Sequence, residues 1–126
     1  MENQGKITLT ETDFRALSSL VSSANTRVAE FLEDELGRAS VVADDQLPQD
    51  VVSMNSKVVY KDLETEKEST VTLVYPHDAN MEENKVSILA PIGSALIGLR
   101  AGDIINWSVP QGKAKQLKVI SVIARF

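Results

Sequence analysis

Three consecutive acidic residues, Glu33, Asp34 and Glu35, are the group of side chains in this 126-residue chain with the clearest chemical potential. Paired carboxylates hold divalent metal ions, and a metal ion held in this way supports phosphodiester chemistry. The alternative is a solvated helical face. We favour that alternative because the three residues fall near the end of a predicted helix, where carboxylates oppose the helix dipole. We therefore expect no metal site here.

The remaining candidates for catalysis are isolated. The chain has one histidine and no cysteine, which excludes a Cys/His nucleophilic pair and a cysteine-rich zinc site. His77 lies between Pro76 and Asp78, and we interpret it as a loop residue. Ser94 follows Gly93 without the strand and sharp turn that present a hydrolase nucleophile, so we expect it to cap a short helix. No glycine-rich phosphate-binding pattern occurs, and we predict neither a catalytic residue nor a cofactor.

Two helical patterns occupy the first part of the chain. Thr10 precedes Asp13 by three residues, close to a capping box, and an apolar stripe at helical spacing follows. Asn25 and Thr26 offer a second N-cap before another stripe over residues 28–39. Each helix would contain about 12 to 14 residues and extend about 20 Å. We predict a short antiparallel hairpin, a small coiled coil, over residues 1–45.

Strand-like alternation replaces the helical spacing from residue 50 onward. The predicted strands cover residues 57–62, 70–75, 86–89, 105–109 and 117–123. Residues 94–99 form a helix too short to be stable alone, so it must cover a sheet face. The segment 40–50 contains Pro48 and separates the two patterns. The expected fold is therefore α+β, with an antiparallel sheet domain over residues 50–126 that carries one short helix.

Charge is distributed unevenly along the chain. Residues 1–50 hold ten acidic and four basic side chains, a net charge of -6, whereas the rest hold eight acidic and nine basic, a net of +1. Nucleic-acid binding depends on cations that neutralise phosphates, so the acidic first segment argues against direct nucleic-acid contact. It would suit a basic protein surface, or it would simply keep an exposed helical segment solvated.

Neither a membrane segment nor a secretory signal is evident. No apolar run approaches the roughly 18 residues that cross a bilayer. The first ten residues, MENQGKITLT, lack a basic stretch followed by an apolar one. We expect a cytoplasmic protein without membrane contact, either a monomer or a weak homodimer.

Four segments carry a family resemblance: VVSMNSKVVYKDL, TLVYP, LAPIGSALIGLRAGD and INWSVPQG. They resemble the regulator of nucleoside diphosphate kinase family, which is related to the C-terminal domain of the bacterial Gre transcript cleavage factors. The resemblance is close over residues 50–126 and holds only in outline before them. It implies a sheet domain with the topology of FK506-binding proteins (FKBP-like), and a protein that binds RNA polymerase near its secondary channel.

The resemblance also implies a contact site. In Gre factors the loop before the short helix contacts polymerase, and its Ser-Pro motif corresponds here to Ala90 and Pro91. The implied polymerase-binding residues are Leu89, Ala90, Pro91, Ile92 and Ser94. Alanine at the serine position removes one polar contact, whereas Pro91 still fixes the loop backbone. The alternative is that this loop only turns the chain.

The family's cleavage chemistry depends on a part that this sequence lacks. Gre factors carry a carboxylate pair at the tip of a much longer helical hairpin, where the pair positions a catalytic magnesium ion. The predicted tip here, residues 22–26, contains no carboxylate. We therefore predict a transcription regulator that is not an enzyme. It would compete with Gre factors for polymerase without cleaving transcripts, and would affect nucleoside diphosphate kinase levels indirectly.

Two other functions stay open at this point. A Gre-type cleavage factor would use the carboxylates of residues 33–35 if the hairpin tip lay elsewhere. An FKBP-like prolyl isomerase would use Trp107, because such isomerases floor their pocket with an aromatic ring. A strand tryptophan is more often part of the core, and six aromatic residues are few for an aromatic-walled pocket.

Overall fold

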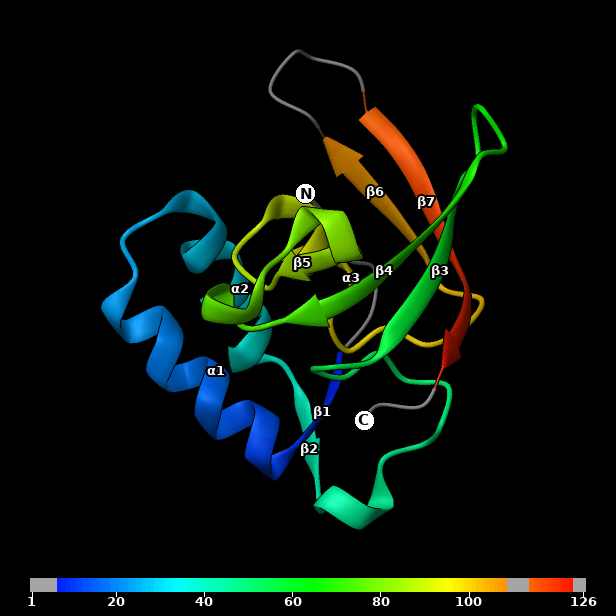
Figure 1. Ribbon diagram of the computed structural model, residues 1–126. Helices are drawn as coiled ribbons and strands as arrows, with labels where there is room; N and C mark the ends of the chain where they lie inside the picture. The colour runs from blue at the N-terminus through cyan, green and yellow to red at the C-terminus, as the bar shows by residue number, and fades with distance from the viewer. Residues whose placement is uncertain (1–6, 109–113, 124–126) are drawn as a thin grey trace.

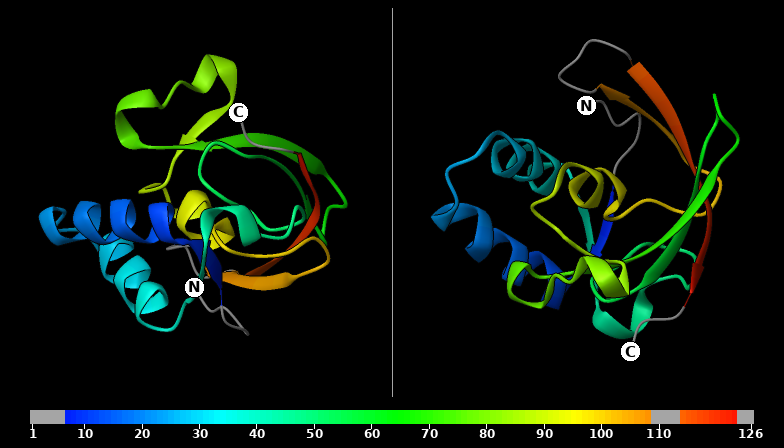
Figure 2. Two further views of the ribbon diagram at one scale, coloured as in Figure 1. Left: turned by 90° about the horizontal axis from the view of Figure 1, so that it is seen from below. Right: turned by 45° about the horizontal axis from the view of Figure 1, so that its top comes forward.

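The computed structural model describes residues 7–108 and 114–123. Two helices lie on one side of the molecule, beside a five-stranded sheet that curves around a third, short helix (Figures 1 and 2). The helices are α1 (Glu11–Ser23), α2 (Arg27–Gly37) and α3 (Pro91–Leu96), and short 3-10 turns are η1 (Asp44–Gln46), η2 (Pro76–Asp78) and η3 (Met81–Glu83). The strands are β1 (Thr8–Thr10), β2 (Ser40–Val42), β3 (Lys57–Asp62), β4 (Glu68–Val74), β5 (Lys85–Ser87), β6 (Ile104–Ser108) and β7 (Ala114–Ile123). The α+β class predicted from the sequence is confirmed.

The first two helices begin where the sequence indicated. Thr10 Oγ1 accepts a hydrogen bond from Asp13 N at 3.1 Å, and Thr26 Oγ1 accepts one from Ala29 N at 3.0 Å. Such bonds satisfy N–H groups that the first turn of a helix leaves without partners. Both predicted caps are confirmed, with Thr26 rather than Asn25 in the second position.

The strand order of the larger sheet is β5-β4-β3-β7-β6. The pairs β3/β4, β3/β7 and β6/β7 are antiparallel, as predicted. The pair β4/β5 is parallel, so the prediction of a wholly antiparallel sheet is wrong here. The cause is the connection over residues 75–84, in which η2 and η3 return the chain far enough for β5 to run beside β4 in the same direction.

A second, two-stranded parallel sheet was not predicted. Its strands β1 and β2 lie directly before α1 and after α2, with Thr8 opposite Ser40 and Leu9 opposite Val41. Three residues are too few for a two-residue alternation to be recognised. The segment 40–50 therefore starts with a strand and continues into η1, while a domain boundary within it remains a prediction.

A shared hydrophobic core joins the helices to the sheet. Its fully buried members include Leu17 and Leu32 from α1 and α2, Val58 and Leu73 from β3 and β4, and Leu96 from α3. Each buried leucine contributes about 1.5–3 kcal/mol relative to an exposed one. Helices this short gain their stability from such packing more than from their own propensity.

Some predictions fall outside the described residues. The backbone of β6 includes position 107, but the side chain of Trp107 and the predicted turn at residues 110–113 are not described. Within the described ranges, none of the helices is both long and apolar enough to cross a membrane.

Candidate functional site

The helix in the predicted contact loop starts earlier than expected. It spans Pro91–Leu96 rather than residues 94–99, and Ala90 occupies the N-cap position without a side-chain hydrogen bond. Proline suits the first helical position because its fixed φ is helical and its missing N–H would have no partner there. Ser94 lies inside the helix and donates from Oγ to the carbonyl of Pro91 at 3.0 Å. The prediction that Ser94 caps this helix is therefore wrong.

Gly93 lets α3 lie against strand β5. A Cβ atom at this position would be 2.3 Å from the carbonyl oxygen of Ser87 and 3.0 Å from Leu73 Cδ1, which is closer than a real side chain tolerates. The loop backbone is fixed on both sides of this contact. Ile88 N donates to Val74 O at 2.8 Å, and Ala90 N donates to Ser87 O at 2.9 Å. The contact loop is thus tied to the ends of β4 and β5 by backbone hydrogen bonds.

The five predicted contact residues differ in exposure. Pro91 is exposed, and Leu89, Ala90 and Ile92 are half-buried. Leu89 and Ile92 also pack against the core, which anchors the loop. Ser94 is only 2% exposed, so its side chain has no surface to offer a partner. The structure therefore brings the first four together at the surface and leaves Ser94 as a support for Pro91.

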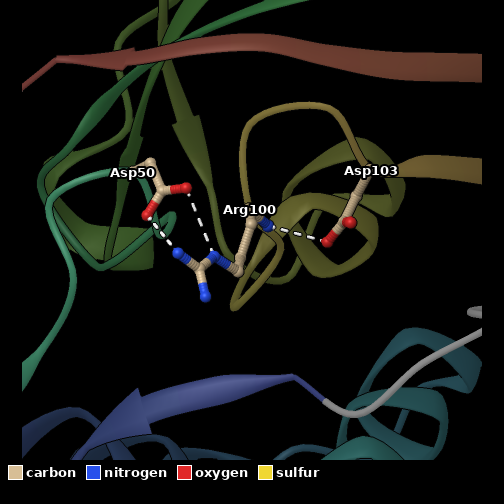
Figure 3. Close-up of polar contacts among 3 residues, drawn as sticks. All are labelled: Asp50, Arg100 and Asp103. Atoms are coloured by element: carbon tan, nitrogen blue, oxygen red, sulfur yellow. Dashed lines mark hydrogen bonds and ion pairs between the residues drawn. The ribbon is translucent and has the colours of Figure 1, made fainter.

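An ion pair that sequence reasoning missed fixes the chain where it leaves α3. Arg100 donates from Nη2 to Asp50 Oδ1 at 3.0 Å and from Nε to Asp50 Oδ2 at 3.2 Å. Its backbone N–H donates to Asp103 Oδ2 at 2.8 Å (Figure 3). The bidentate geometry makes this a strong charge-assisted contact. Nothing in the sequence linked Arg100 to a residue fifty positions earlier.

Helix α1 is attached to the rest of the chain through two aspartates. Asp13 is 7% exposed, and its Oδ2 accepts from Met54 N at 3.1 Å. Asp44 accepts from the backbone N–H of Thr12 at 3.1 Å and from the Thr12 hydroxyl. Burial raises the pKa of the Tyr75 hydroxyl, and the charge of Asp13 raises it further. The start of α1 is therefore held on the segment that leads into the sheet.

The acidic run does not form one solvated face. Glu33 and Asp34 are exposed, but Glu35 is 2% exposed and pairs with Arg38. The expectation of a solvated side chain is wrong for Glu35, because its position on α2 turns it inward while its neighbours point outward. Across residues 7–108 and 114–123, no three histidine, cysteine or acidic side chains are grouped closely enough to hold a metal ion.

His77 lies in η2, as its loop context predicted. Its ring stacks with Tyr75 at a centroid separation of 6.4 Å, and its Nε2 is 3.3 Å from Asp78 Oδ2. The histidine side chain is 79% exposed. This setting is typical of a surface residue.

Two cavities lie away from the contact loop. One of about 340 Å³ is lined by Leu47, Pro48, Gln49, Val51, Ser53, Ser56, Val122 and Ile123. The other, of about 350 Å³, is lined by Tyr60, Asp62, Thr65, Lys67, Ser69, Lys115 and Leu117. Tyr60 is the one aromatic residue among these described lining residues, which do not form an aromatic-walled proline pocket.

Comparison with known proteins decides the family. The family model "Rnk N-terminus" matches residues 6–42, and the model "Transcription elongation factor, GreA/GreB, C-term" matches residues 47–124. The "Regulator of nucleoside diphosphate kinase" of Escherichia coli strain K12 is 39% identical over 99 residues, which are 79% of this chain and 73% of that protein. The chain belongs to the Rnk family. This assignment confirms the resemblance seen in the sequence, and the E. coli relative is named as a regulator.

Relatives of known structure support the same fold for this Rnk-family chain. A GreA/GreB elongation factor from Nitrosomonas europaea superposes with a TM-score of 0.80 at 38% identity, covering 96% of this chain and 100% of that one. Gfh1 of Thermus aquaticus, at 24% identity and a TM-score of 0.54, shares the fold alone.

The GreA of Clostridium botulinum strain Hall is 43% identical over 84 residues, which are 67% of this chain and 52% of that protein. The match to GreA thus spans about half of the longer factor.

Proposed function

We propose that this protein is a transcription regulator that binds RNA polymerase near the secondary channel, in competition with Gre factors. The contact would be made by Leu89, Ala90, Pro91 and Ile92. Two observations support this proposal. The GreA/GreB family model matches residues 47–124. Similar proteins from Clostridium botulinum and Nitrosomonas europaea are named as transcription elongation factors. The partly exposed loop at the start of α3, held to the sheet by backbone hydrogen bonds, suits docking on a protein surface.

The further proposal is that binding occurs without transcript cleavage. The observation that carries it is the end of the helical arm: α1 is about 20 Å long, and residues 24–26, which connect it to α2, hold no carboxylate. We take α1 and α2 as an antiparallel hairpin within a unit of residues 1–45, attached to an FKBP-like unit of residues 50–126. Delivery of a catalytic metal would require carboxylates at the far end of that arm.

The effect on nucleoside diphosphate kinase named for the E. coli relative would then be indirect. A regulator bound to polymerase changes the synthesis of other proteins and needs no kinase-binding or nucleotide-binding site. We propose a bacterial cytoplasmic protein that acts as a monomer or weak homodimer.

A competition pull-down tests the proposal. Core RNA polymerase should retain the protein, and a Gre factor added in excess should release it. A Pro91→Glu variant should bind about tenfold more weakly, because it places a charge at the centre of the contact while glutamate is well tolerated in a first helical turn. Lys67→Glu, an exposed change in the turn between β3 and β4, is the control and should bind normally.

Two results would contradict the proposal. One is retention of the protein on polymerase in the presence of saturating Gre factor, which would place it at a different site. The other is equal binding by the Pro91→Glu and Lys67→Glu variants, which would leave the loop with only a chain-turning role.

A further inference from the structure

Within residues 7–108 and 114–123, the five-stranded sheet has one face that no helix covers. Its inner face holds buried side chains such as Val58, Leu117 and Val119 and curves around α3. Helices α1, α2 and α3 lie on that side, so none of the described helices lies over the opposite face of β3, β6 and β7 (Figures 1 and 2). We call this the outer face. Its charged and apolar residues are Lys57, Val59, Lys61, Ile104, Lys118 and Ile123, with Ile120 at the β-bulge, and its polar residues are Asn106, Gln116 and Ser121.

Two lysines face each other on the outer face. Lys61 on β3 is directly opposite Lys118 on β7. Like charges at such positions destabilise a sheet. On the neighbouring strand β4, Glu68 is opposite Lys61. Even so, none of the ion pairs among the described residues involves Lys57, Lys61 or Lys118. By contrast, Lys115 on the inner face pairs with Asp62 at 3.5 Å. The positive charge of these three lysines is therefore not neutralised by an ion pair among the described residues.

Large apolar side chains lie among these lysines. Ile104 and Ile123 are each 44% exposed, and Ile120 at the bulge is 37% exposed. Lys118 is opposite Ile104, and Lys57 is opposite Ile123, so apolar and cationic side chains alternate across the strands. Exposed apolar side chains grouped within a charged rim mark protein interaction sites.

We infer that the outer face is a second docking surface for RNA polymerase, and that it takes a polymerase surface with carboxylates around an apolar centre. The inference rests on the proposed function. Charge complementarity defines the partner: cationic side chains require acidic ones, and the isoleucines require apolar contact. The contact loop follows β5 at one edge of the sheet, whereas the outer face covers β3, β7 and β6, so a partner as large as polymerase reaches both.

Two other occupants fit the face less well. A second copy joined by two-fold symmetry would place lysines against lysines. Nucleic acid would bring phosphates onto isoleucines, and the face as defined offers neither arginine nor an aromatic ring for base stacking.

Binding of charge-reversed protein to nucleic-acid-free core polymerase tests the inference. The double variant Lys61→Glu/Lys118→Glu reverses the sign of the face, and it also places a second carboxylate opposite Glu68, so its fold is checked by circular dichroism before binding is measured. We expect its Kd to rise about tenfold or more, with a difference from the unmodified protein that shrinks as salt screens the contact. The matched control is Arg15→Glu/Lys67→Glu, which makes the same change in net charge at two exposed residues elsewhere and should bind within about twofold.

Further variants separate charge from apolar contact and from misfolding. Ile104→Thr keeps a β-branched side chain in the edge strand and should weaken binding by about threefold. Lys61→Gln/Lys118→Gln removes the like-charge contact, so it should be no less stable than the unmodified protein and should still bind more weakly. Circular dichroism and thermal unfolding report whether each variant is folded.

Each contrary outcome has a distinct meaning. If the unmodified protein binds and a Gre factor displaces it, but the outer-face variants bind like the control, the second docking surface is wrong and the proposed function stands. If the unmodified protein does not bind polymerase, both fall. If the variants lose affinity only for polymerase loaded with nucleic acid, the face binds nucleic acid and the inference is overturned.

Discussion

Gly93 is the residue on which the geometry of the contact loop depends most directly. Without a side chain, it allows α3 to lie against the carbonyl of Ser87, and this approach keeps Ala90 within hydrogen-bonding distance of β5. Any Cβ would push first against the backbone oxygen of Ser87, which yields less easily than the end of a flexible side chain. The glycine therefore fixes the position of Pro91 relative to the sheet.

Gly93→Ala should lower the free energy of unfolding by about 1–3 kcal/mol, because overpacking of a tight site forces backbone shifts. Urea unfolding followed by circular dichroism measures the change. Gly37→Ala is the control, since nothing lies within 4 Å of a Cβ at that position, and it should be neutral or stabilising by up to about 1 kcal/mol. Equal stability of Gly93→Ala and the unmodified protein would show that the close approach is not required.

Asp62 should give the protein a pH-dependent contribution to stability. Its pKa is lowered from the ordinary 3.8, first by the backbone N–H of Glu64, with further contributions from Thr65 and Lys115. Because the folded-state pKa is the lower one, the carboxylate stabilises the fold above pH 3.8 and the contribution disappears as pH falls through the folded-state value. Asp62→Asn should therefore lose stability near neutral pH, with a difference from the unmodified protein that vanishes in acid. Urea unfolding over a pH series tests this, and a difference independent of pH would contradict it.

At the scale of elements, the junction between α1 and the sheet rests on a buried hydrogen bond. The Asp13 carboxylate is the acceptor for Met54 N, across 41 positions in the sequence. Asp44 adds a second attachment at the start of the helix. These contacts orient α1, and so determine where the end of the helical arm lies relative to the contact loop.

Asp13→Ala should destabilise the protein by about 1–3 kcal/mol, because it leaves a buried backbone N–H without its partner. Hydrogen exchange at Met54 N should become markedly faster. The control is Glu11→Ala, an exposed change in the same helical turn, which should cost less than about 1 kcal/mol and leave that exchange rate unchanged. Unaltered protection of Met54 N in Asp13→Ala would show that the aspartate does not hold the junction.

The sequence predicted those elements whose signals are local. Thr10 and Thr26 were recognised as caps because the hydroxyl oxygen and the N–H that donates to it are three residues apart. Strand β3 was predicted with its observed ends because its alternation spans six residues. The parallel pairing of β5 depends on how residues 75–84 return the chain, which no short pattern encodes. The start of α3 at Pro91 was not predicted, because a proline before an apolar run fits a turn as well as the first position of a helix. The Arg100–Asp50 ion pair was not predicted because it depends on tertiary folding.

At the scale of the whole molecule, the distribution of charge and the length of the first two helices favour the same function. The acidic first segment contains α1 and α2, while the outer face of the sheet carries Lys57, Lys61 and Lys118, which form no ion pair within the part of the chain that the structure describes. A protein with this distribution can meet both basic and acidic regions of one large partner. Helix α1 is about 20 Å long, and the residues between α1 and α2 are Ala24, Asn25 and Thr26. These features favour a protein that occupies a site on its partner without catalysing a reaction there.

The most direct test of that function is the length of the RNA in a stalled elongation complex supplied with magnesium. Added alone, at a concentration that saturates polymerase, the protein should leave the RNA 3′ end unshortened. Added together with a Gre factor, it should suppress Gre-dependent shortening progressively as its concentration rises. Shortened RNA in the presence of this protein alone would contradict binding without cleavage.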